Sequence, residues 1–193
     1  AHGSRHDVGI DAIRHAGLLL AALDRFERDE LSRRTHPLLG RPSLHAAMIT
    51  GGSGWSTYAE QCVLRIERRT IPGETGSGAL AEIDELCAAL ANEAPSFSAE
   101  TRLVCAQPPL DLASDAPLTQ AVLAAARHEQ PDTPIEGLSC WTDAALFNAA
   151  GIPALCFGPG DIARAHSAEE WVEPSQIERA ARVLEQVCAG WGR

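Results

Sequence analysis

The chain has 193 residues, of which 45% are apolar and 22% are charged, a balance typical of soluble globular proteins that excludes a disordered or fibrous chain. Sixteen basic against 26 acidic side chains give a net charge of −10, which argues against nucleic acid as a partner, because phosphates attract basic surfaces. No apolar run approaches the ~20 residues that cross a membrane, and the N-terminus lacks the order of a signal peptide. The sequence therefore predicts a cytoplasmic protein.

The first part of the chain alternates between helical and strand patterns. The predicted elements, in chain order, are a helix over 8–34, strands over 43–50 and 61–70, a helix over 79–92 and a strand over 97–106. Gly51-Gly52 lies at the turn between the two middle strands. This order resembles part of a split βαβ sandwich whose opening strand would precede His2.

The pattern of predicted elements changes after Pro108-Pro109, which predicts a boundary between a domain over 1–107 and a segment over 108–193. The segment is expected to hold helices over 118–128, 143–150 and 174–190, and a buried parallel strand over 152–157 that feeds Gly158-Pro159-Gly160. The predicted fold class is α/β: a two-layer α/β domain lacking its first strand, followed by one segment of a second α/β domain.

The six cysteines form no CxxC or CxH pair, which argues against a zinc-knuckle site. Most of them lie within apolar runs, as Cys156 does in Ala-Leu-Cys-Phe. They are expected to be buried, reduced thiols that act as small apolar side chains.

The densest group of polar residues spans 158–170 and includes His166, Glu169 and Glu170 behind the Gly158-Pro159-Gly160 loop. Ligands of open α/β sheets bind beyond the carboxyl ends of strands, where glycines let backbone amides approach closely. An imidazole beside carboxylates suits a metal ligand or a general base. The alternative is a tight turn with a solvated histidine.

Three further places could carry chemistry. His2 stands just ahead of the first predicted helix, where it could help to stabilise an oxyanion or belong to a frayed terminus. Arg68-Arg69 could clamp a carboxylate or be solvated. Thr142-Asp143 is most simply a helix cap and a first-turn acid.

No HxD, HExxH, GxSxG or GxxxxGK[ST] string occurs in the chain, so it holds no complete catalytic motif of these kinds. Read in order, however, the motifs resemble the acetylornithine deacetylase, succinyl-diaminopimelate desuccinylase, aminoacylase and carboxypeptidase G group, which is metallopeptidase family twenty. The matching strings are Ala1-His2-Gly3-Ser4-Arg5, Glu67-Arg68-Arg69-Thr70-Ile71-Pro72-Gly73-Glu74, Trp141-Thr142-Asp143-Ala144, Gly158-Pro159-Gly160 and Ala165-His166.

The resemblance implies a split catalytic domain with an inserted dimerisation (lid) domain, and two metal ions, Zn2+ with Co2+ or Mn2+ as alternatives. It implies that His166 ligates a metal, with Glu170 as an acid behind it. The same likeness implies that His2 reaches the partner subunit's active site and polarises the scissile carbonyl. Arg69 would lie near the substrate carboxylate, and Gly158, Pro159 and Gly160 would line the pocket.

The chain departs from the family pattern at His6 and Ala59, where proline is common, and at Ser56, where many members have asparagine. The HxD ligand, the bridging aspartate and the Glu-Glu pair that supplies the family's general base are also missing; Glu169-Glu170 stands at a different place in the pattern. The resemblance thus implies the C-terminal half of a longer, homodimeric metal-dependent hydrolase that cleaves the amide bond of N-acyl amino acids or related small substrates. The alternative is an inactive dimerisation module or truncated gene product.

Overall fold

The computed structural model describes residues 1–191, and its contacts divide the chain into two compact units, Ala1–Gln107 and Pro108–Arg193. The first unit contains α1 (Ala12–Asp29), η1 (Leu31–Arg33), β1 (Ser43–Gly51), β2 (Cys62–Arg69) and α2 (Gly76–Glu93). The second contains α3 (Pro117–Glu129), α4 (Ala144–Ala149), η2 (Ile162–Arg164) and α5 (Pro174–Gly190). The mixture of helices with a small sheet agrees with the predicted α/β class, whereas the functions assigned to the two units stay predictions.

The predicted opening helix begins four residues later and ends five residues earlier than expected. Asp11 caps α1 by accepting hydrogen bonds from the amides of Ile13 (3.0 Å) and Arg14 (3.4 Å). Val8 and Gly9 instead form a turn in which both amides donate to the Arg5 carbonyl. A cap that satisfies otherwise unpaired amides fixes where a helix begins, whatever apolar residues precede it.

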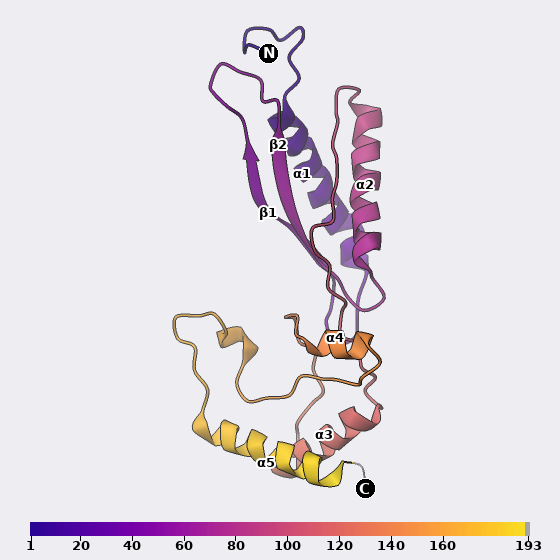
Figure 1. Cartoon of the computed structure of the whole chain (residues 1–193), viewed down its shortest axis with the longest axis vertical. Helices are drawn as coiled ribbons and strands as arrows, with labels where there is room; N and C mark the ends of the chain where they lie inside the picture. The colour runs from indigo at the N-terminus through magenta and orange to yellow at the C-terminus, as the bar shows by residue number, and fades with distance from the viewer. Residues whose placement is uncertain (192–193) are drawn as a thin grey trace. The chain divides into compact units, whose positions relative to one another are not determined.

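The sheet of the first unit consists of two antiparallel strands, as the alternating segments predicted. β1 pairs with β2 from Ser43 opposite Arg69 to Gly51 opposite Cys62, with an irregularity between Ala46 and Met48. α1 lies against this sheet and also contacts α2 (Figure 1). The core between them is apolar and consists of Leu19, Ala22, Leu23, Leu31, Leu44, Cys87, Leu90 and Phe97.

The expected strand over 97–106 is not a strand in the structure. Phe97 is buried in the core, the Thr101 hydroxyl bonds the Asp84 carboxylate of α2, and Ala106 lies against Gly76 at the start of α2. Side chains therefore fasten this segment to α2. A strand needs a neighbouring backbone to complete its ladder, and the sheet that the structure describes has only β1 and β2.

In the second unit, α3 and α5 pack together through a small apolar core (Figure 1). Ala125 and Ala126 of α3 are buried with Val183 of α5. At the edge of this contact, the Arg182 Nε donates to the Glu129 carboxylate at 2.8 Å. That hydrogen bond is the main cause that lowers the pKa of Glu129. All three predicted helices of this unit are confirmed, with ends within one residue of those expected.

Two details of the second unit differ from the sequence prediction. Residues 152–157 form no strand, and Ile152 is 55% exposed, because the described part of this unit offers no other strand to pair with. Thr142 does not cap α4: Asp143 occupies the cap position, without a side-chain hydrogen bond, and the Thr142 hydroxyl lies 3.0 Å from the Cys156 sulfur. Gly151, with φ of 79°, follows the end of α4 as predicted.

The cysteines were expected to be buried, and only Cys87 is. Cys62 is partly buried, and four thiols are exposed, namely Cys105, Cys140, Cys156 and Cys188. Burial raises the pKa of the Cys87 thiol, which keeps it in the unreactive protonated form. Cys105, Cys140 and Cys156 lie outside helices and strands, and Cys188 occupies an exposed position of α5.

A cluster of two arginines and two glutamates closes one end of the first unit. Glu74 Oε1 accepts from Arg34 Nη1 at 2.8 Å and from Arg68 Nη2 at 2.6 Å. Arg34 also bonds Glu82 of α2 at 2.5 Å, and the Ile71 amide donates to Glu74 Oε2 at 3.0 Å. This four-charge cluster ties the loop before β1, the end of β2 and the first half of α2 together.

Burial of Glu74 raises the pKa of its carboxyl group, but the hydrogen bonds from Arg68, Arg34 and the Ile71 amide outweigh burial and hold that pKa below its usual range. Ionised Glu74 therefore stabilises the fold above its unfolded-state pKa of roughly 4.3. The stabilisation is lost as the pH falls through the lower, folded-state pKa.

No helix of the described residues is long and apolar enough to span a membrane.

We expect Glu74→Gln to lower the free energy of unfolding by about 1–3 kcal/mol at neutral pH, because it leaves the Arg68 guanidinium without its nearest carboxylate. The difference should shrink as the pH falls through the lowered folded-state pKa of Glu74, because the wild-type carboxyl group then also becomes neutral. Urea denaturation, followed through the amide NMR signals of α2, measures the loss of stability at neutral pH and its decrease at low pH. Glu85→Gln, at an exposed site on the same helix, is the control and should change stability by less than about 0.5 kcal/mol. Equal effects of the two variants would contradict the stabilising role of the cluster.

Candidate functional site

The N-terminal segment that carries His2 is held against the loop between β1 and β2. The Gly3 amide donates to the Ser56 carbonyl at 2.7 Å, and the Tyr58 amide donates to the Ala1 carbonyl at 2.9 Å. His2 and Thr57 face each other in an antiparallel bridge between these bonds. In Figure 1 the two loops meet at the end of the first unit that bears the label N. The His2 backbone is thus fixed, rather than frayed.

The positions that depart from the family pattern help to build this contact. Ser56 receives the Gly3 amide through its carbonyl, and the Ala59 carbonyl accepts from the Ala12 amide at 2.9 Å. The Tyr58 ring lies so close to Gly9 that a Cβ there would be 2.5 Å from a ring carbon. Backbone bonds and one close glycine contact therefore join the N-terminal segment to the loop.

The two adjacent arginines predicted as a carboxylate clamp point to opposite faces of the sheet. Arg68 shares the face of Leu64 and Ile66, and its side chain is 9% exposed within the four-charge cluster. Arg68 is therefore committed to Glu74 and does not face solvent. Arg69 ends β2 on the exposed face, where its Nη1 donates to Glu67 Oε1 at 2.9 Å.

Glu67 also faces His45 of β1, whose Nε2 lies 3.4 Å from Glu67 Oε2. The strand register places these two residues opposite each other, so the pair is a cross-strand contact. Glu67 stands in one of the matching strings, but the sequence predicted no role for Glu67 or for His45. The signal that could have found them is the alternation of β2, which puts Glu67 and Arg69 on one face. A charged ligand that reaches this face can replace the contact between the Glu67 carboxylate and the Arg69 guanidinium with a contact of its own.

The loop around His166 is ordered by its own hydrogen bonds. The Gly160 amide donates to the Gln176 side chain at 2.9 Å, and the Asp161 carboxylate accepts from the Ala163 amide at the start of η2. His166 has φ of 63°, a left-handed conformation that costs a non-glycine residue of order 1 kcal/mol. Its amide donates to Glu170 Oε2 at 3.1 Å, so Glu170 bonds the backbone of His166 in this structure.

The side chains that the structure describes do not form a complete metal site. Within residues 1–191 no group of three or more His, Cys, Asp and Glu side chains has a suitable arrangement. Catalytic zinc takes three protein ligands, and His166 by itself supplies one. The described residues thus do not fit a complete metal site.

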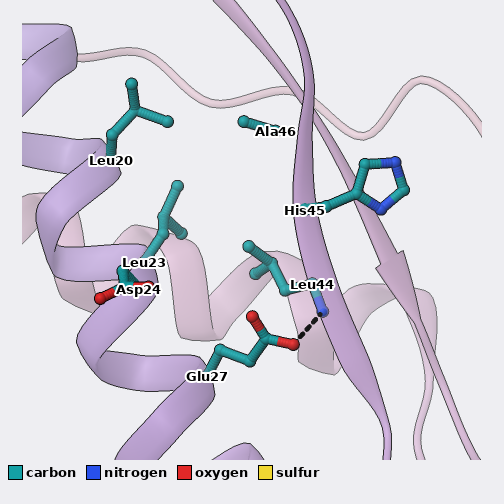
Figure 2. Close-up of a pocket in the computed structure, with 7 residues that line it drawn as sticks. All are labelled: Leu20, Leu23, Asp24, Glu27, Leu44, His45 and Ala46. Carbon is teal, nitrogen blue, oxygen red and sulfur yellow. Dashed lines mark hydrogen bonds between the residues drawn. The ribbon is translucent and has the colours of Figure 1, made fainter.

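One cavity of the first unit, of about 210 Å³, lies between α1 and β1. It is lined by Leu20, Leu23, Asp24, Glu27, Leu44, His45 and Ala46. Figure 2 shows the His45 ring on the far side of β1 from this cavity, and Glu27 accepting from the Leu44 amide at 3.4 Å. The cavity is therefore separate from His2 and from the Glu67 and Arg69 side chains.

Comparison with known proteins connects these observations. The family model described as Peptidase family M20/M25/M40 matches residues 9–189. This match covers nearly the whole chain, and the chain belongs to that family.

Individual relatives agree with the family assignment. Over 192 residues the chain is 28% identical to the acetylornithine deacetylase of Myxococcus xanthus, which covers 97% of the chain and 49% of the relative. The fold is similar to a tripeptidase from Staphylococcus aureus (TM-score 0.68, 18% identity, covering 97% of the chain and 47% of that protein). It is equally similar to a metallo-carboxypeptidase of family M20 from Sulfolobus solfataricus (TM-score 0.68, 13% identity, covering 96% and 54%). The chain spans about half the length of the curated relatives that it matches along its whole length.

We expect Gly9→Ala to loosen the N-terminal segment, because the new Cβ would push the Tyr58 ring out of place, at a cost of about 1–3 kcal/mol. The amides of Gly3 and Tyr58 should then exchange faster with solvent, as hydrogen-exchange NMR would measure. Gly17→Ala is the control, since Gly17 lies in α1 with nothing within 4 Å of a new Cβ. It should stabilise α1 by about 0.5–1 kcal/mol. Unchanged exchange in Gly9→Ala would contradict the close contact.

Proposed function

We propose that this chain is the C-terminal part of a metal-dependent amidohydrolase that cleaves the amide bond of N-acyl amino acids or related small substrates, in the manner of an acetylornithine deacetylase. The observation that carries the proposal is the family match over residues 9–189, together with a deacetylase relative aligned along 97% of the chain. The names of the relatives share one reaction type, hydrolysis of a C–N amide bond.

The first unit would act as the dimerisation (lid) domain, lacking its first strand. In this role His2 would donate a hydrogen bond to the scissile carbonyl oxygen in the partner subunit's site. The ordered backbone at His2 supports this role, because a donor that is already in place loses little entropy in the transition state. Arg69 would receive the substrate carboxylate on the exposed face of β2, in competition with Glu67.

The second unit, residues 108–193, would be the C-terminal segment of the catalytic domain. His166 would be one ligand of a metal site, Zn2+ with Co2+ or Mn2+ as alternatives, and the other ligands would come from outside this chain. Gly158, Pro159 and Gly160 would line the substrate pocket. Glu170 would keep the loop that presents His166 in place through the His166 amide.

A catalytically inactive dimerisation module, or a truncated gene product, is the second candidate. The geometry of His166 favours it for the isolated chain, since a single imidazole cannot form a catalytic zinc site. Calorimetry with Zn2+ and a deacylation assay on N-acetyl amino acids separate the two. Weak zinc binding without turnover is expected of the chain by itself, and tight stoichiometric binding with turnover would contradict that expectation.

In a longer enzyme that contains this chain, His166→Ala should abolish activity, because it empties a metal position. His2→Ala should lower kcat by about 10²–10³-fold with unchanged metal content, because it removes a donor to the oxyanion. Mixing the two impaired variants should restore part of the activity, since each hybrid dimer assembles one site from the intact residues of both subunits. No recovery after confirmed subunit exchange would exclude action of His2 across the dimer.

Self-association is proposed to use the free edge of β1. Within the described sheet β1 pairs only with β2, and Met48 and Ile49 on β1 are 58% and 52% exposed. An exposed, apolar strand edge can pair with a second copy of itself. The cavity between α1 and β1 gives side chains of the second copy a place to pack.

The chain should dimerise in analytical ultracentrifugation, and Met48→Lys with Ile49→Lys should weaken the dimer at least about tenfold, because charges at a strand edge oppose pairing. Val104→Lys is the control: Val104 is 83% exposed and lies outside β1. A wild-type chain that stays monomeric at tens of micromolar would exclude the β1 edge as the interface.

A further inference from the structure

The His2 side chain is held by its neighbour two residues along the chain. The Ser4 amide donates to His2 Nδ1 at 3.2 Å, and the Ser4 hydroxyl oxygen lies 2.8 Å from the same nitrogen. Both contacts converge on one ring nitrogen. Ser4 therefore restrains the ring by two groups, one on its backbone and one on its side chain.

These contacts determine which ring nitrogen carries the proton. A backbone amide can only donate, so Nδ1 must offer a lone pair to the Ser4 N–H. In a neutral imidazole the proton then resides on Nε2, because the hydrogen bond at one ring nitrogen sets the tautomer. With Nδ1 unprotonated, the Ser4 hydroxyl also donates to it. Nε2, on the opposite side of the ring, then carries the N–H.

The backbone beneath the ring is fixed as well. The amides of Gly3 and Tyr58 bond across to the loop between β1 and β2, and the Arg5 amide donates to the His2 carbonyl at 2.8 Å. A ring with a fixed backbone and a fixed Nδ1 has a defined direction for its Nε2–H bond. Such a neutral imidazole can polarise a carbonyl group without first being protonated.

We propose that Ser4 is a positioning residue that holds His2 in the Nε2–H tautomer and aims this proton at the carbonyl oxygen of the substrate's acyl group. The inference rests on the proposed function for the identity of the acceptor. The hydrogen bonds between Ser4 and His2 lie within this chain and do not depend on the proposed function. No proton is transferred in this role: Nε2 donates a hydrogen bond that strengthens as negative charge develops on the oxygen.

The tautomer can be tested in the chain as it is. In a 15N-labelled sample at about pH 8, where imidazoles are neutral, ring nitrogen shifts should place the proton of His2 on Nε2 and show a single ring orientation. Ser4→Ala removes the shorter contact, so the ring should average among rotamers, whereas Ser4→Thr keeps the hydroxyl and should preserve the wild-type signals. Ser32→Ala, which removes a hydroxyl bonded to the Arg28 carbonyl, is the control and should leave His2 unchanged. A proton on Nδ1 would overturn the proposal.

The functional part is tested by a double-mutant cycle in the longer enzyme. Ser4→Ala should lower kcat by about 3- to 10-fold at unchanged KM, Ser4→Thr should restore it, and Ser4→Ala should have no further effect in a His2→Ala background. An unchanged kcat in Ser4→Ala, or an equal loss in both backgrounds, would overturn the positioning role. An enzyme without any activity on N-acyl amino acids would instead contradict the proposed function, and the ring signals would still decide whether Ser4 sets the tautomer of His2.

Discussion

The alternation of side chains along β2 decides what each of its charged residues can do. Successive residues of a strand point to opposite faces, so Arg68 turns toward the core side and Arg69 toward the exposed face. The inward arginine is nearly buried and forms ion pairs with Glu74 and Glu82. The outward arginine pairs with Glu67 on the exposed face. A one-residue slip of the β1–β2 register would exchange these roles.

The four-charge cluster is also connected to the candidate site through the backbone. Arg68 Nη1 donates to the carbonyl of Arg69 at 2.6 Å, so the ion pairs that hold Arg68 also hold the end of β2. Glu74 in turn receives the Ile71 amide and shapes the turn that follows. The position of the Arg69 backbone thus depends on charges that lie on the opposite face of the sheet.

The sequence was informative wherever structure depends on local periodicity. The apolar spacing of α2 and α5 and the alternation of β1 and β2 are strong local signals, and these elements were predicted correctly. The start of α1 was missed because Val8 and Ile10 continue the apolar pattern, although each is 59% exposed and lies ahead of the Asp11 cap.

The sequence could not show which backbone segments or side chains lie next to one another in the fold. Residues 97–106 and 152–157 have the composition of strands, but a strand exists only if another backbone lies beside it. The same limit applies to the candidate site: family motifs pointed to His2, Arg69 and His166, whereas the contacts of these residues with Ser4, Glu67 and Glu170 depend on backbone geometry. A two-residue spacing such as that of His2 and Ser4 carries no sequence signal of its own.

The thiols of the chain differ in how accessible they are to oxidants. Cys87 is shielded and protonated in the core of the first unit, whereas three of the four exposed thiols, Cys140, Cys156 and Cys188, belong to the second unit. Oxidation therefore acts first on exposed sulfurs, where it can link two copies covalently. Copies joined in this way would be held mainly through the second unit and separated by a reductant, whereas copies held by the proposed β1 interface would not respond to a reductant.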